Sequence, residues 1–110
     1  MDAPLAMTID RFRSLVGERT IYIYAVNLEG IGYLKRFQRY GFKVGGFIDS
    51  RSFPENRRRG QPVIHPDAFF TGPRDDALVL ITAKHRQTRK QAIELCERAG
   101  RGGVLQAHAA

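Results

Sequence analysis

The chain has 110 residues, enough for one domain with its own core, and its 43% hydrophobic and 10% aromatic content is typical of a soluble globular protein. It has no apolar run near the ~20 residues of a membrane span, no export signal, and a single cysteine, Cys96, which excludes an intrachain disulfide. We therefore expect one cytoplasmic domain over residues 1–110, with a loose leader at 1–7 and a frayed tail at 107–110.

The first predicted element is a short amphipathic helix. Apolar residues recur at three- and four-residue spacing from Ile9 to Val16. Thr8 is expected to cap this helix, and Gly17 is expected to end it.

A βαβ unit follows directly. Residues 20–24 are β-branched and aromatic without alternation, as expected of a strand covered on both faces. Apolar residues then recur at helical spacing between 31 and 37, and Gly41 is expected to end that helix. Residues 44–48 form the second predicted strand of the unit.

The next segment begins with a polar loop. Residues 51–61 hold proline, glycine and three consecutive arginines without any periodicity, which predicts a loop. Residues 62–64 predict a short strand. Pro66 suits the first turn of a brief helix that runs through Phe70.

The last third of the chain predicts a strand, a helix and a final strand. Residues 77–83 are the most apolar run and are expected to form a central parallel strand. Apolar residues around Cys96 mark the inner side of a helix that Gly100 is expected to end. Residues 103–106 offer a last short strand.

Strands that alternate with helices predict an α/β fold. We expect a three-layer Rossmann-like domain with about five mostly parallel strands in the order 3-2-1-4-5 and helices on both faces. In such a sheet, ligands bind beyond the carboxyl ends of the strands, where the strand order reverses. The loops at 25–30, 49–59 and 82–86 are expected to meet there.

The first of these loops departs from the Gly-x-Gly-x-x-Gly dinucleotide fingerprint. Ala25 and Asn27 stand at the first two glycine positions, and Gly30 keeps the third. Because Asn tolerates a positive φ, the turn is still expected to form, and Gly30 can still allow close helix-to-strand packing. However, the Asn27 side chain and the charge of Glu29 disfavour a phosphate at this helix N-terminus.

The second loop contains an acid and several arginines. Asp49 lies 19 residues after Gly30, near the ~20-residue spacing of an acid that holds ribose hydroxyls, although it can instead cap the next turn. Arg51 suits a phosphate on that ribose, as in a phosphorylated dinucleotide. The run Arg57–Arg59 is either a solvated loop or a clamp for pyrophosphate, which forked guanidinium donors bind well.

The third loop is also basic. Lys84, His85 and Arg86 follow the predicted central strand directly, so they are expected at the ligand edge of the sheet. Two basic loops at one edge predict an anionic small-molecule ligand.

No complete catalytic or metal-binding set is found. Three scattered histidines and one cysteine lack metal-ligand spacing. His65 precedes Pro66 at a strand-to-helix junction and is interpreted as a capping or packing residue, and Cys96 as a core residue. Tyr-x-x-x-Lys, Gly-x-Ser-x-Gly and Walker patterns are absent.

Four stretches together resemble a known family. They are Ile-Tyr-Ile-Tyr-Ala-Val-Asn-Leu-Glu-Gly, Tyr-Gly-Phe-Lys-Val-Gly-Gly-Phe-Ile-Asp-Ser, Gly-Gln-Pro-Val-Ile-His-Pro and the strand at 77–83. They are similar to the Rossmann-like N-terminal domains of bacterial sugar acyltransferases and nucleotide-sugar dehydratases and epimerases, which act in polysaccharide biosynthesis. A similar module closes some sugar C-methyltransferases.

The resemblance implies a nucleotide site. Family members with an intact fingerprint bind a nucleotide-sugar or a nicotinamide dinucleotide. By position, the resemblance places the phosphate loop at Ala25, Asn27 and Gly30 and the ribose-side acid at Asp49. The chain lacks the catalytic domains of these enzymes, so the resemblance implies a binding module or a subunit for a separate partner enzyme.

Three functions are compatible with these features. The favoured one is a non-catalytic module that binds NAD(P), a UDP-sugar or a related nucleotide, in surface polysaccharide biosynthesis. The alternative is an interaction or homodimerisation module that has lost its ligand. A nucleic-acid binder using Arg57–Arg59 is less favoured, because the formal charge of +7 is spread over every segment without a basic tail. A membrane partner is not expected.

Overall fold

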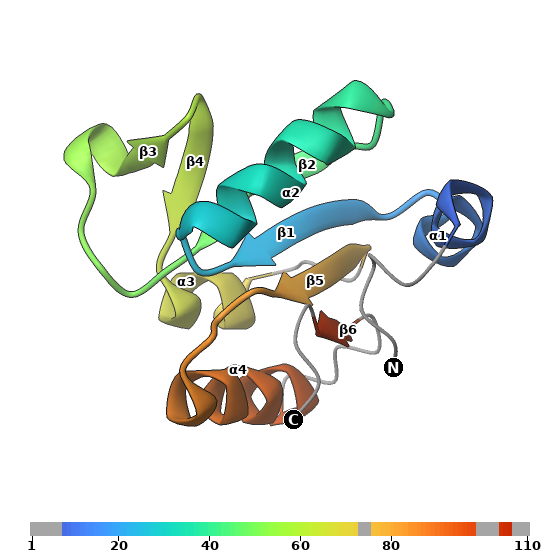
Figure 1. The fold of residues 1–110 in the computed structure, drawn as a ribbon. Helices are drawn as coiled ribbons and strands as arrows, with labels where there is room; N and C mark the ends of the chain where they lie inside the picture. Colours follow the sequence, from blue (N-terminus) through green and yellow to red (C-terminus); the bar gives the residue numbers. More distant parts are fainter. Residues whose placement is uncertain (1–7, 73–75, 99–103, 107–110) are drawn as a thin grey trace.

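The structure, a computed structural model, describes residues 8–72, 76–98 and 104–106. Helices and strands alternate along the chain, as Figure 1 shows. In order, the elements are α1 (Ile9–Val16), β1 (Thr20–Tyr24), α2 (Leu28–Arg39), β2 (Val44–Ile48), the 3-10 turn η2 (Pro54–Asn56), β3 (Arg57–Arg58), β4 (Gln61–Ile64), α3 (Pro66–Thr71), β5 (Ala77–Ile81), α4 (Arg86–Arg98) and β6 (Val104–Gln106).

The strands form one mostly parallel sheet, which confirms the predicted α/β class. Its order is β3-β4-β2-β1-β5-β6. The pairs β1–β2, β1–β5, β2–β4 and β5–β6 are all parallel. The whole sheet differs from the predicted five-strand order 3-2-1-4-5 by the additional edge strand β3; without β3, the order is β4-β2-β1-β5-β6.

The extra strand belongs to a hairpin that the sequence analysis interpreted as loop. β3 pairs antiparallel with β4, with Arg58 opposite Gln61. The two residues between them, Arg59 and Gly60, both have positive φ, at 52° and 77°. Two such residues in a two-residue loop make the turn that matches the twist of paired strands. The prediction of an irregular loop over 51–61 was therefore wrong at its carboxyl end.

Helices cover both faces of the sheet, so the domain has three layers (Figure 1). Side chains of α1 and α2 pack with Ile21 and Ile23 of β1 on one face. Side chains of α3 and α4 pack with Tyr24 on the other face. β5 is buried along its whole length, which explains its continuous apolar sequence and its place between β1 and β6.

The ends of the first two helices follow the expected capping chemistry. The Thr8 hydroxyl accepts a hydrogen bond from the Arg11 N–H at 3.2 Å, and Gly17 ends α1 with a φ of 57°. Gly41 follows α2 with a φ of 78°. The Phe42 N–H donates to the Phe37 carbonyl at 2.9 Å, and the two rings meet edge to face. This combination is a Schellman motif with its usual apolar contact.

Several expectations fall on residues that the structure does not describe. These are the loose leader at 1–7, the helix end at Gly100 and the frayed tail at 107–110. Among the described helices, none combines the length and the apolar composition that a membrane span requires.

The approach of α2 to β1 and β5 leaves no room for a side chain at Gly30, as the sequence analysis expected. A Cβ atom there would lie 2.7 Å from the Ala25 carbonyl oxygen and 3.2 Å from side-chain atoms of Ile23 and Thr82. Gly32, on the same helix, has open space at the equivalent point. The third glycine position of the fingerprint is therefore required by packing alone.

We predict that Gly30→Ala lowers the free energy of unfolding by about 1–3 kcal/mol, because the new methyl group must displace a backbone carbonyl. Urea denaturation followed by circular dichroism measures this change. Gly32→Ala is the matched control and should stabilise the protein by up to about 1 kcal/mol through helix propensity. Equal effects of the two substitutions would contradict the packing role of Gly30.

Candidate functional site

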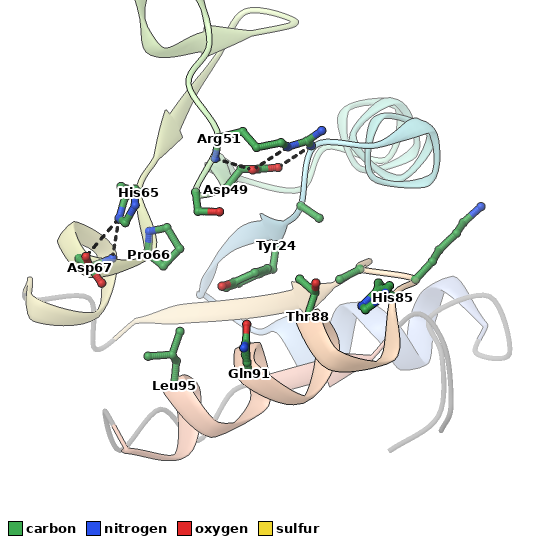
Figure 2. A pocket seen from close by; sticks show the side chains of 14 residues that line it. Tyr24, Asp49, Arg51, His65, Pro66, Asp67, His85, Thr88, Gln91 and Leu95 are labelled. Atoms are coloured by element: carbon green, nitrogen blue, oxygen red, sulfur yellow. Dashed lines mark hydrogen bonds and ion pairs between the residues drawn. The ribbon is translucent and has the colours of Figure 1, made fainter.

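The loops that follow the parallel strands meet at one edge of the sheet and line an open cleft of about 490 Å³. This size is within the usual range for small-molecule sites. Figure 2 shows the cleft between α3 and α4, with Tyr24 across its floor. Its lining comes from residues 24–25, 49–51, 65–67 and 83–85, and from Thr88, Gln91 and Leu95 of α4.

Five of the eight site residues predicted from the sequence line this cleft, and three lie outside the lining. Those in the cleft are Ala25, Asp49, Arg51, Lys84 and His85. Those outside are Asn27, Gly30 and Arg86. Arg57–Arg59 also lie outside it, because they belong to β3 and its turn at the far edge of the sheet.

Asn27 occupies the N-terminus of α2 with its own side chain. Its Oδ1 accepts a hydrogen bond from the Gly30 N–H at 2.7 Å, and its Nδ2 donates to the Thr82 carbonyl at 3.1 Å. The turn forms as expected, but Asn27 has extended backbone, and the positive φ of 91° falls on Ala25 instead. The amino end of α2 is therefore satisfied from within the protein.

Asp49 ties two neighbouring loops together. Its carboxylate is 7% exposed and accepts hydrogen bonds from the Val26 N–H at 2.8 Å and from the Arg51 N–H at 2.9 Å. The second bond closes the turn after β2, as the capping interpretation from the sequence describes. Both carboxylate oxygens are thus used to join the end of β1 to the end of β2.

Arg51 completes this arrangement, which we call the Asp49 clasp (Val26, Asp49 and Arg51). The guanidinium donates to Asp49 through Nε at 3.0 Å and through Nη2 at 2.8 Å, and Nη2 also reaches the Val26 carbonyl. The group lies over the Phe53 ring at 5.4 Å. Much of its positive charge is therefore neutralised within the protein.

The clasp shifts the titration of both partners. Burial acts to raise the pKa of Asp49. This effect is outweighed by hydrogen bonds from the Arg51 side chain and from the Val26 and Arg51 N–H groups, together with the Arg51 charge, so the net pKa is lowered. The hydrogen bond to Asp49 raises the pKa of Arg51 above its ordinary value. Asp49 is therefore held as a carboxylate.

Lys84 and His85 stand at the amino end of α4 and are exposed to the cleft. No ion pair joins either side chain to an acid in the described part of the chain. The first turn of α4 contains no acidic residue, and no described side chain accepts a hydrogen bond from its first N–H groups. The positive end of the helix dipole and the Lys84 ammonium repel each other. An anion bound between them would relieve this repulsion and would be stabilised there.

His65 both caps α3 and lines the cleft. Its Nδ1 accepts a hydrogen bond from the Asp67 N–H at 3.1 Å and lies 3.6 Å from the Asp67 carboxylate. This confirms the capping interpretation from the sequence. Because Nδ1 accepts this hydrogen bond, the ring proton lies on Nε2. His65 can therefore donate a hydrogen bond into the cleft through Nε2.

Tyr24 was missed by the sequence analysis. Burial raises the pKa of its phenol to about 12, with smaller contributions from Cys96, Asp49 and Asp67. The residue is 7% exposed, and its hydroxyl has no hydrogen-bond partner among the described residues. Its place as the last residue of β1, on the face opposite Ile23, was the available signal.

The α4 side of the cleft was missed as well. Thr88, Gln91 and Leu95 recur at helical spacing and form one edge of the helix, next to the buried side that holds Ala92 and Cys96. The burial of Cys96 confirms its assignment to the core. In residues 8–72, 76–98 and 104–106, no three His, Cys, Asp or Glu side chains are grouped as they would be around a metal ion.

Comparisons of this chain with protein-family models, with curated proteins and with solved structures find no match. The resemblance to sugar acyltransferase and dehydratase domains therefore stays a hypothesis.

We predict that Asp49→Asn lowers the free energy of unfolding at pH 7 by about 1–3 kcal/mol, a range that allows for the solvent exposure of Arg51. Because folding lowers the pKa of Asp49, its stabilisation is present above the unfolded-state value of ~3.9 and is lost as the pH falls through the folded-state value. Urea denaturation between about pH 7 and pH 3 measures this dependence.

The free energy of unfolding of Asp49→Asn should therefore fall less between pH 7 and pH 3 than that of the wild-type protein. Glu94→Gln, which neutralises an exposed carboxylate of α4, is the control and should leave both the stability and its pH dependence nearly unchanged. An Asp49→Asn protein with wild-type stability at pH 7 and wild-type acid sensitivity would contradict the clasp.

Proposed function

We propose that the protein is a non-catalytic module that binds an anionic small molecule, a nucleotide or nucleotide-sugar, in the cleft at the carboxyl edge of its sheet. The observation that carries this proposal is the meeting of Lys84, His85 and the amino end of α4, which no described side chain caps, at one end of a cleft. Binding beyond the carboxyl ends of parallel strands is the general rule for open α/β sheets.

The chemistry of the lining supports a ligand with both charge and hydroxyl groups. Lys84 supplies a positive charge that has no acidic partner among the described residues. His65, Thr88 and Gln91 supply polar groups that donate and accept hydrogen bonds. Sugars and nucleosides present hydroxyl groups of this kind.

A dinucleotide in the standard orientation is less well supported. That orientation places a pyrophosphate at the amino end of the helix after β1. In this protein Asn27 already bonds the Gly30 N–H there, and Glu29 lies in the same turn. The resemblance implies NAD(P) as a ligand, so NAD(P) is included in the binding test. The resemblance also implies a role in surface polysaccharide biosynthesis beside a separate enzyme.

We predict that Lys84→Gln weakens ligand binding about tenfold, the effect of losing one charge-assisted contact. A thermal-shift screen against NAD(H), NADP(H), UDP-sugars, uridine monophosphate and coenzyme A identifies a ligand, since about 100 times Kd adds ~2.7 kcal/mol of stability. Isothermal titration calorimetry then compares the variants.

Arg86→Gln is the matched control, because it removes the same charge two residues away but lies outside the cleft lining. It should weaken binding less than threefold. If every compound in the panel leaves the melting temperature unchanged, the proposed function is wrong. A stable dimer in light scattering would then favour the interaction module.

A further inference from the structure

The two ends of the cleft differ in charge and in chemistry. This difference restricts the class of ligand, an inference that rests on the proposed function. Figure 2 shows His85 and Thr88 toward the amino end of α4, and Pro66 and Leu95 toward the opposite end. The Tyr24 ring points away from His85, toward the Pro66 and Leu95 end. All five residues line the same cleft.

The end beside Lys84 and His85 suits an anion. Its backbone N–H groups belong to the first turn of α4, which no described side chain caps. The first turn of α4 contains no acidic residue that would repel an anion. A phosphate would accept hydrogen bonds from this turn and offset the repulsion between Lys84 and the positive end of the helix.

The end that holds the Tyr24 hydroxyl suits an uncharged group. Burial is the main cause of the raised pKa of Tyr24, and the Asp67 carboxylate, which lines this end of the cleft beside Pro66, adds negative potential there. The same potential would repel a second phosphate placed there. With a pKa of about 12, the phenol stays protonated and can donate a hydrogen bond at neutral pH.

The Tyr24 hydroxyl is a donor that the described part of the protein leaves unused. The residue is more than nine-tenths buried, and its hydroxyl still faces the cleft. The Gln91 amide adds a donor and an acceptor nearby, and Pro66 and Leu95 provide apolar walls. A hydroxylated ring between apolar walls would use both features.

We propose that the ligand is a phosphate monoester of a hydroxylated ring, with its phosphate at the amino end of α4 and its ring hydroxyls at Tyr24 and Gln91. Nucleoside monophosphates and sugar phosphates share this chemistry. A dinucleotide does not fit it, because the internal pyrophosphate would need the amino end of α2, which Asn27 occupies.

The test compares phosphorylated and unphosphorylated probes by isothermal titration calorimetry. The probes are uridine monophosphate, uridine, glucose 1-phosphate, glucose, inorganic phosphate and NAD. The variants are Lys84→Gln and Tyr24→Phe, with Lys90→Gln and Tyr40→Phe as controls.

Lys90 and Tyr40 are exposed and lie outside the cleft lining. Because the Tyr24 hydroxyl bonds to no described group, Tyr24→Phe should keep the wild-type melting temperature.

The expected pattern separates the two ends of the cleft. Lys84→Gln should weaken a phosphate monoester about tenfold and leave its unphosphorylated parent within twofold of wild type. Tyr24→Phe should weaken both about fivefold, and each control should change either by less than twofold. Whether uridine monophosphate or glucose 1-phosphate binds more tightly decides between a nucleoside and a sugar.

Two results would overturn the inference. If NAD binds more tightly than either monoester and is insensitive to Tyr24→Phe, the ligand class is wrong while the proposed binding function stands. If no probe binds, the inference fails, while the proposed function fails only if the UDP-sugars and the other compounds of the thermal-shift panel are silent as well. Equal losses of monoester and parent compound on Lys84→Gln would also reject the phosphate position.

Discussion

The buried carboxylate of Asp49 is the constraint on which the cleft depends. Parallel strands deliver all their exits to one edge, but they do not fix how the loops at that edge lie. Asp49 fixes two of them, because it bonds the Val26 N–H beyond β1 and the backbone and side chain of Arg51 beyond β2. With both loops held, Tyr24 and Ala25 form the floor of the cleft, and α3, α4 and the loop after β5 line its sides.

The two helix N-termini near this edge have opposite chemistry, and this contrast locates the candidate ligand. The α2 end is closed by the Asn27 amide and carries Glu29. The α4 end has no described side-chain cap, and Lys84 and His85 line the cleft beside it. Of these two helix ends, the one after β5 is therefore the better electrostatic site for an anion.

Much of the fold was predictable because local signals agreed with packing. The apolar run at 77–83 was correctly predicted as a buried parallel strand, although the strand ends at Ile81, and Gly41 ends its helix as predicted. The β3–β4 hairpin was missed because its turn needs a positive φ at Arg59, a conformation that arginine does not favour and that the sequence therefore does not indicate. The roles of Tyr24 and Gln91 depend on the gap between α3 and α4, a tertiary feature that periodicity does not encode.

The position of the bound phosphate tests the central claim most directly. A titration of the ¹⁵N-labelled protein with uridine monophosphate, followed through backbone amide shifts, reports that position. The account predicts that the largest shifts fall on residues 84–88, at the amino end of α4, with smaller ones at Tyr24 and Gln91. Largest shifts at residues 27–31, at the amino end of α2, would contradict it.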